Sequence, residues 1–266
     1  MTLSNSIPFI AGNWKMFKTN PEAVDLVSDL MNGSEGLLEG AEMVVFPPFT
    51  ALYSVSVSIE RSGIKLGGQN LHWEDKGAFT GEVSAPMLKS VECQFVVIGH
   101  SERRQYFGET NETVNKKIKA ALKHDLTPIV CIGESKEQRE KNQTKDHIST
   151  QINEGLAGLD EKQVKKIILA YEPIWAIGTG LTATPEQAEE VHAFIREQIE
   201  EKYGKDAASC AIILYGGSVK PANAYSLLKE KDINGALIGG ASLEAESFLE
   251  ITKEAIKAYK EKWAQY

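Results

Sequence analysis

The sequence alternates eight short apolar runs with longer amphipathic stretches, and this order limits the folds that the chain can adopt. The runs are nearly continuous in apolar residues and occupy 7–11, 43–46, 64–68, 95–98, 128–132, 167–170, 211–214 and 236–238. A strand that is covered on both faces carries apolar residues at consecutive positions, as in parallel sheets. The runs are therefore interpreted as eight strands of one parallel sheet.

The stretches between the runs carry helix signals. Thr19 or Asn20 is a suitable N-cap in front of Pro21, and apolar residues then recur at helical spacing. Further helices are expected over 111–122, from 185, from 221 and over 242–258. The repetition of strand and helix, without a linker or a shift in composition, predicts one α/β domain over residues 1–266.

Eight strand–helix units in 266 residues fit a closed (β/α)8 barrel, and an open, doubly wound sheet is the alternative. The alternative stays open because periodicity does not give the order of strands in a sheet. A barrel places its functional side chains where strands run out into the following segments. Six polar motifs lie at such exits: GNWK, GHSER, CIGE, YEPIW, YGGS and IGGAS.

Composition limits the partners that the protein can bind and the cellular compartment in which it is expected. The formal net charge of -8 argues against nucleic acid or an anionic membrane, since both require basic surfaces. Cys93, Cys131 and Cys210 form no paired motif, and each adjoins an apolar run, so all three are expected to be buried, reduced thiols. Without a signal-peptide pattern or an apolar run of spanning length, a cytoplasmic protein is expected.

Glu172 and His100 are the candidate acid–base pair. Glu172 follows an apolar run, and removal from water makes a carboxylate a stronger base. His100 lies just before an expected helix start at Ser101, where the positive helix end favours a neutral imidazole that can donate a hydrogen bond. The structural alternatives are a glutamate paired with a cation and a hydrogen-bonded core histidine.

Two further groups of residues suit an anionic ligand. Lys15, with Asn13 two residues before it, supplies a positive charge at a strand end, unless it is an ordinary solvated lysine. The motifs YGGSV and IGGAS place glycine pairs at the last two strand exits, where backbone N–H groups can approach a phosphate. Ordinary tight turns also use such pairs.

These elements together indicate proton transfer on a small phosphorylated carbonyl compound. Removal of a proton next to a carbonyl gives an enediolate, which can expel a neighbouring phosphate when water has access. The segment 173–184, attached directly to Glu172 and rich in glycine at its tip, is interpreted as a lid that excludes water. The sequence contains no metal-ligand cluster or dinucleotide fingerprint, so neither a metal nor an organic cofactor is expected.

The motifs AGNWKMF, GHSERR, AYEPIWAIGTG, YGGSV and GGASL closely resemble those of the triosephosphate isomerase family, in the same order and over essentially the whole chain. The resemblance implies a TIM barrel that interconverts dihydroxyacetone phosphate and D-glyceraldehyde 3-phosphate in glycolysis and gluconeogenesis. It implies Glu172 as the base, His100 as the neutral electrophile, Lys15 and Asn13 as substrate-holding groups and Glu102 as the partner of the lysine. The implied substrate-binding residues are Asn13, Lys15, Ile177, Gly178, Ser218, Leu237, Gly239 and Gly240.

The resemblance also implies a homodimer, held by the loop 69–84, with Thr80 near Asn13 and Lys15 of the neighbouring subunit. Two places depart from the family pattern: Leu181 at the far end of the lid, and the long tail 259–266. The alternative functions are a non-catalytic barrel that binds a sugar phosphate, and another phosphate-binding barrel isomerase or epimerase.

Overall fold

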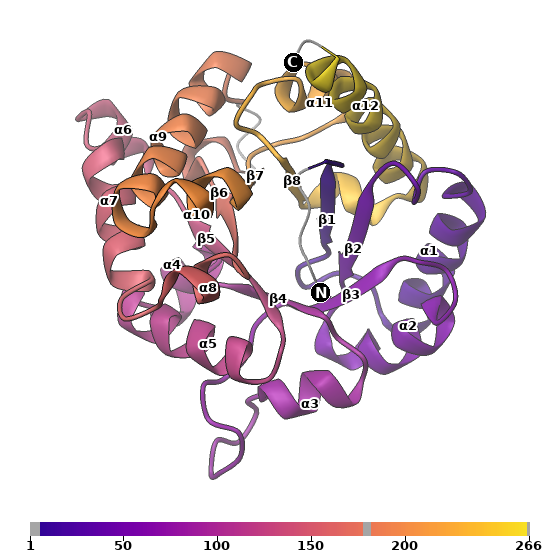
Figure 1. Cartoon of the computed structure of the whole chain (residues 1–266). Coiled ribbons are helices and arrows are strands. Elements are labelled where there is room, and N and C mark those ends of the chain that lie inside the picture. Colours follow the sequence, from indigo (N-terminus) through magenta and orange to yellow (C-terminus); the bar gives the residue numbers. More distant parts are fainter. Residues whose placement is uncertain (1–5, 178–181, 265–266) are drawn as a thin grey trace.

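The computed structural model describes residues 6–177 and 182–264 and shows a closed barrel of parallel strands (Figure 1). The strands follow one another around the barrel in sequence order: β1 (Phe9–Asn13), β2 (Glu42–Phe46), β3 (Lys65–Gly68), β4 (Phe95–Ile98), β5 (Thr127–Ile132), β6 (Ile168–Tyr171), β7 (Ile212–Tyr215) and β8 (Gly235–Ile238). β1 pairs with β8 in parallel, with Phe9 opposite Gly235. This closure confirms the barrel and excludes the open sheet.

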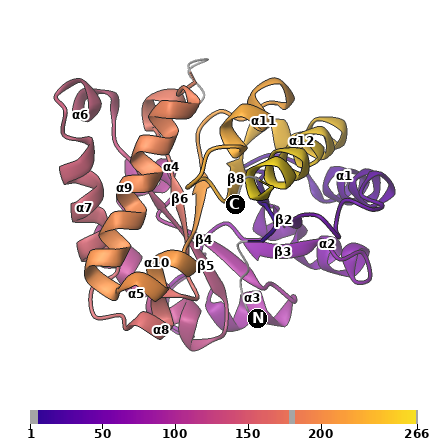
Figure 2. The same ribbon diagram turned by 45° about the horizontal axis from the view of Figure 1, so that its top comes forward.

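Helices surround the strands on the outside, as Figures 1 and 2 show from two directions. The α-helices of the described residues are α1 (Asn20–Gly33), α2 (Leu52–Ile59), α3 (Ala85–Ser90), α4 (Ser101–Phe107), α5 (Asn111–Lys123), α6 (Lys136–Glu140), α7 (Thr144–Gly155), α8 (Glu161–Val164), α9 (Pro185–Tyr203), α10 (Lys205–Cys210), α11 (Pro221–Leu228) and α12 (Ala245–Trp263). Short 3-10 turns are η1 (Phe49–Ala51), η2 (Ile174–Ala176) and η3 (Gly240–Leu243).

Two cores explain why the strands are apolar at consecutive positions. Alternate strand residues, such as Phe9, Ala11 and Leu214, fill the inside of the barrel. The residues between them, such as Ile10 and Ile213, pack outward against the helices. Since both faces of each strand are covered, neither face carries the polar residues of a solvated sheet.

The structure corrects some details of the sequence analysis. The last helix begins at Ala245 rather than at 242 and runs on to Trp263, because η3 separates it from β8. Cys93 and Cys131 are buried as expected, but Cys210 is exposed in the last turn of α10. The prediction for Cys210 was wrong because this residue ends a helix and precedes the strand, instead of belonging to it.

Candidate active site

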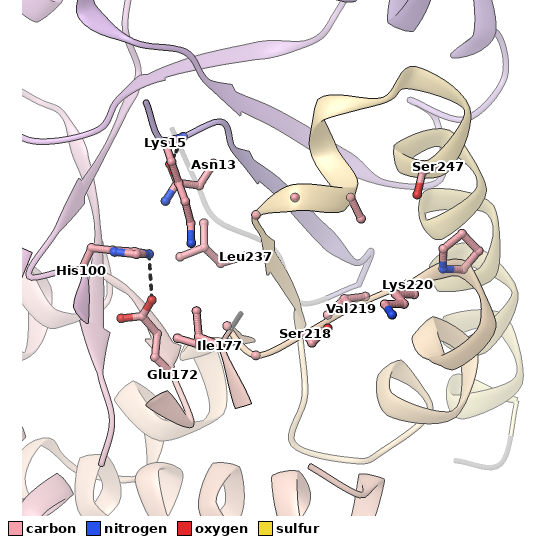
Figure 3. Close-up of a pocket in the computed structure, with 16 residues that line it drawn as sticks. Asn13, Lys15, His100, Glu172, Ile177, Ser218, Val219, Lys220, Leu237 and Ser247 are labelled. Carbon is pink, nitrogen blue, oxygen red and sulfur yellow. Dashed lines mark hydrogen bonds and ion pairs between the residues drawn. The ribbon is translucent and has the colours of Figure 1, made fainter. Parts of the chain in front are cut away.

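A cavity of about 530 Å³ opens at the carboxyl ends of the strands, where Figure 3 shows its lining side chains. Nine of the predicted site residues line it: Asn13, Lys15, His100, Glu172, Ile177, Ser218, Leu237, Gly239 and Gly240. They come from the ends of β1, β4, β6, β7 and β8 and from the segments that follow. The predicted substrate-binding residue Gly178 lies outside the described residues, as does Leu181. The predicted lid 173–184 is described only at its two ends.

Glu172 directly follows β6 and is 2% exposed. Its backbone N–H donates to the carbonyl of Ile132 at 2.7 Å, which continues the β5–β6 pairing by one residue. Its Oε2 accepts from the backbone N–H of Ser101 at 2.9 Å, and its Oε1 lies 3.0 Å from Nε2 of His100. Both carboxylate oxygens are therefore hydrogen-bonded to the protein, although water is almost entirely excluded from this side chain.

Two glycines make room for Glu172 because they have no side chain. A Cβ at Gly133 would lie 1.8 Å from the backbone oxygen of Glu172, and a Cβ at Gly216 would lie 2.9 Å from its Cγ. Real Cβ atoms do not approach other atoms this closely. The motifs CIGE and YGGS thus contribute to the site by lacking side chains, a role that the sequence analysis did not assign to them.

His100 follows β4 and is the N-cap of α4. Its Nδ1 accepts from the backbone N–H of Glu102 at 3.3 Å, so the ring proton is on Nε2, which donates to Glu172. Arg104 fixes the backbone before this residue through a hydrogen bond from Nε to the carbonyl of Gly99 at 2.8 Å. The Nε2 side of the ring is therefore directed toward Glu172 in the pocket.

Lys15 adopts a left-handed backbone conformation with φ of 52°, which is unusual for a residue with a long side chain. Its N–H donates to Oδ1 of Asn13 at 3.0 Å, and its carbonyl accepts from Nε2 of Gln69 at 2.8 Å. These two bonds hold the strained residue in place. The ammonium then reaches Glu102 Oε1 at 2.7 Å, so Glu102 contacts Lys15 and does not itself line the cavity.

The glycine pairs expected to bind phosphate lie together on one side of the cavity. Ser218 follows β7, while Gly239 and Gly240 follow β8. Asn223 fixes the first of these loops, since its Nδ2 donates to the Ser218 carbonyl at 3.1 Å and its Oδ1 accepts from the Lys220 N–H at 2.7 Å. Two loops that are far apart in the sequence thus form one continuous wall.

Glu134 is a buried carboxylate that the sequence analysis did not single out, although it lies in the CIGE motif. Its Oε1 accepts from Tyr171 Oη at 3.1 Å, Trp175 Nε1 at 2.9 Å and Arg139 Nη1 at 3.3 Å. Trp175 lies in η2, three residues after Glu172. Glu134 therefore anchors the start of the predicted lid to the end of β5.

The remaining ionisable groups have other roles. His72, His124, His147 and His192 do not line the cavity. His192 is fully buried between Tyr171 and Tyr215 on the outside of the barrel, and desolvation lowers its pKa to about 3. Among the described residues no cluster of His, Cys, Asp and Glu is arranged to hold a metal ion. None of the described helices has the length and apolar character needed to cross a membrane.

A closed (β/α)8 barrel whose pocket joins a buried carboxylate, an imidazole and an ammonium group fits an enzyme of the isomerase class, which the family comparison shows. Residues 8–255 match the family described as "Triosephosphate isomerase". The chain therefore belongs to the triosephosphate isomerase family.

Individual relatives agree with this assignment. Triosephosphate isomerase from Caldanaerobacter subterraneus subsp. tengcongensis is 55% identical over 244 residues, which cover 92% of this chain and 98% of that protein. The protein of the same name from Endomicrobium trichonymphae is 54% identical over 246 residues, with the same two coverages. The crystal structure of triosephosphate isomerase from Bartonella henselae is similar to this one with a TM-score of 0.84, at 40% identity, over 93% of this chain and 98% of that one.

Proposed function

We propose that the chain interconverts dihydroxyacetone phosphate and D-glyceraldehyde 3-phosphate through an enediolate, with Glu172 as the base. The observation that carries this proposal is the convergence of Glu172, His100 and Lys15 on one cavity from three different strand exits. A carboxylate, a neutral hydrogen-bond donor and a fixed cation are the groups that proton transfer next to a carbonyl requires. The names of the relatives support the same substrates.

In the proposed reaction Glu172 removes a proton from the carbon that bears the hydroxyl group, and the electron pair moves onto the carbonyl oxygen. The Nε2–H of His100 donates to that oxygen, and Lys15 with Asn13 stabilises the negative charge that develops there. The proton of the neighbouring hydroxyl group passes to the former carbonyl oxygen through Nε2 of His100, and Glu172 returns its proton to the former carbonyl carbon, so that the ketone becomes the aldehyde. Glu102 acts as a positioning residue through its ion pair with Lys15.

The base must move before it can act. Oε1 of Glu172 pairs with Nε2 of His100 and Oε2 accepts from the Ser101 N–H, so the carboxylate faces protein donors rather than a substrate carbon. The segment 173–184 begins immediately after Glu172, and its first turn contains Trp175, which is bound to Glu134. Closure of this segment over the substrate would release the carboxylate from its partners and exclude water in the same movement.

The proposed phosphate site consists of backbone N–H groups at Ser218, Gly239 and Gly240, with Gly178 contributing from the lid. Gly240 lines the cavity, and a Cβ at this position would meet no atom within 4 Å. Ile177 and Leu237 provide the apolar contacts that cover the base. Phosphate held by main-chain donors keeps the reacting carbons at a fixed distance from Glu172.

A dehydrogenase-linked isomerase assay of the purified chain tests the function, with Glu172→Asp as the variant. The shorter side chain moves the carboxylate away from carbon by about one methylene, and the expected loss in kcat is about 100-fold or more. The Ki of inorganic phosphate should stay within a factor of about two, since the phosphate-binding loops are unchanged. A parent chain that binds phosphate but has no turnover would favour the non-catalytic alternative, and turnover of a different sugar phosphate would favour the related isomerase.

A homodimer is proposed on the same basis, with the loop 69–84 of one subunit covering the pocket rim of the other. Residues 76–82 of this loop are exposed, and Met16 and Phe17, which follow Lys15, are exposed apolar side chains at 94% and 56%. Burial of this surface by a second copy would explain its composition. Size-exclusion chromatography with light scattering should give twice the chain mass of 29.2 kDa. We also propose that the protein is cytoplasmic and that residues 1–266 act as one catalytic domain.

A further inference from the structure

The active-site cavity extends beyond the proposed phosphate loops toward the outer rim. Lys220 and Ser247 lie on the side opposite the His100–Glu172 pair, as Figure 3 shows, and Pro221 also lines the cavity. Lys220 is exposed and Ser247 lies in the first turn of α12. Lys220 thus combines exposure to solvent with a place in the cavity wall.

The charges of the inner pocket do not favour a dianion before it is bound. Lys15 is paired with Glu102 at 2.7 Å, and Glu172 adds a further carboxylate to the wall. These three side chains together carry one net negative charge, and the whole chain has a formal net charge of -8. Neither the charge of the chain nor that of these three side chains therefore attracts a phosphate dianion from a distance.

Lys220 is the exception at the cavity wall. Among the described lining residues it is the cation that has no ion pair. Its charge cancels the net negative charge of the inner pocket. The N-terminus of α11, where Pro221 is the first residue, adds the partial positive charge of a helix end to the same part of the rim.

We infer that Lys220 is a capture residue, which attracts the phosphate of the substrate at the rim before the phosphate reaches the inner loops. This inference rests on the proposed function, because it takes a phosphate dianion as the ligand. The side chain of Asn223 accepts a hydrogen bond from the Lys220 N–H and donates one to the Ser218 carbonyl. Lys220 is therefore held at a fixed position relative to the inner loop. Lys220 does not touch the reacting carbons and is assigned no chemical step.

The test compares Lys220→Ala with Lys162→Ala at two ionic strengths. Lys162 is also exposed, lies in α8 before β6 and is therefore near the other end of the barrel. The two variants change the net charge equally, so any difference between them reports the position of the charge. At about 10 mM salt the Debye length is about 30 Å, and at about 300 mM it falls to about 6 Å.

At low salt, kcat/KM of Lys220→Ala should fall by about three- to tenfold relative to the parent, while kcat changes less than about twofold. The Ki of inorganic phosphate should rise by a similar factor, and Lys220→Arg should restore both values. The loss should become smaller than about twofold at high salt. Lys162→Ala should resemble the parent throughout.

Equal values of kcat/KM for the two alanine variants at low salt would overturn the inference. A loss that stays constant between the two ionic strengths would also overturn it, because it would indicate a change in loop structure rather than in attraction. The parent chain measured in the same assay tests the proposed function separately. An inactive parent refutes that function, whereas an active parent with an indifferent Lys220 refutes only the capture role.

Discussion

The carboxylate of Glu172 lies 3.0 Å from Nε2 of His100, although the two residues follow β6 and β4, which are not neighbours in the barrel. The contact passes over the end of β5, where Gly133 leaves room for the backbone of Glu172. A glycine at one strand exit thus allows two chemically important side chains from the flanking strands to meet.

Replacement of the imidazole should separate catalysis from binding. His100→Gln removes a donor that is directed into the pocket by the bond between Nδ1 and the Glu102 N–H. We expect kcat to fall by about 100- to 10,000-fold, the range typical for loss of an acid–base group. The Ki of inorganic phosphate should be unchanged, which competition assays at fixed substrate concentration can measure. A decrease in kcat of less than about fivefold would contradict the assigned role.

The space beside Glu172 should be as important as the carboxylate itself. In Gly216→Ala the new Cβ would lie 2.9 Å from Glu172 Cγ and 3.1 Å from the Tyr171 carbonyl, so the base must shift. A displacement of this size should lower kcat by about 10- to 100-fold. Gly155→Ala is the matched control, because its Cβ would meet only Val114 at an ordinary 3.8 Å. Circular dichroism should show both variants folded, and equal kcat values for the two would refute the packing argument.

The lid anchor should contribute to stability. Trp175→Phe keeps the aromatic ring but removes the bond from Nε1 to Glu134, whose carboxylate is fully buried. Loss of a hydrogen bond to a buried carboxylate costs about 1.5–3 kcal/mol, which urea unfolding can detect. Trp263→Phe serves as control, since Trp263 is 51% exposed near the end of α12. Equal unfolding free energies in the two variants would show that the Glu134 bond contributes nothing.

The buried imidazole of His192 predicts sensitivity to acid. Desolvation lowers its pKa from 6.5 to about 3, so between these values the unfolded chain binds a proton that the native chain excludes. The contribution of His192 to stability is therefore fully present above pH 6.5 and decreases as the pH falls through this window. Between pH 7 and pH 5 the ring should lower the free energy of unfolding of the parent by about 2 kcal/mol.

His192→Phe removes that contribution. The quantity to compare is the change in unfolding free energy between pH 7 and pH 5, not its value at either pH. Urea unfolding of both proteins at pH 7 and pH 5 gives the two changes. The variant should lose about 2 kcal/mol less than the parent over this interval, even when it is less stable at pH 7. Identical losses would mean that His192 contributes nothing to the acid response and would contradict the prediction. The pKa of Glu189 is raised to about 7, mainly by desolvation, which favours the native state at low pH and acts in the opposite direction.

Most of the fold follows from local sequence features. The apolar runs give strands because both faces are covered, and strand exits place Glu172 and His100 correctly on the rim. The roles of Ser101, Gly133 and Gly216 were missed because they arise from contacts between strand exits that are far apart in the sequence. Closure of the sheet depends on the pairing of β1 with β8, for which periodicity holds no information.

Two side chains show the limits of local patterns from opposite directions. Cys210 adjoins an apolar run and yet is exposed, because α10 ends at this residue before β7 begins. His192 belongs to none of the motifs and yet is fully buried, on the same face of α9 as Ala188, Ile195 and Ile199. Its spacing of three and four residues from apolar neighbours was the available signal.

Transfer of a substrate proton to Glu172 is the central claim, and exchange with solvent deuterium tests it most directly. The parent and Glu172→Gln are incubated with dihydroxyacetone phosphate in D2O, and proton NMR follows deuterium entering the carbon next to the carbonyl. The account predicts rapid incorporation with the parent and a rate at least about 1,000-fold lower with the variant, which cannot accept the proton. Incorporation at the parental rate by Glu172→Gln would contradict it.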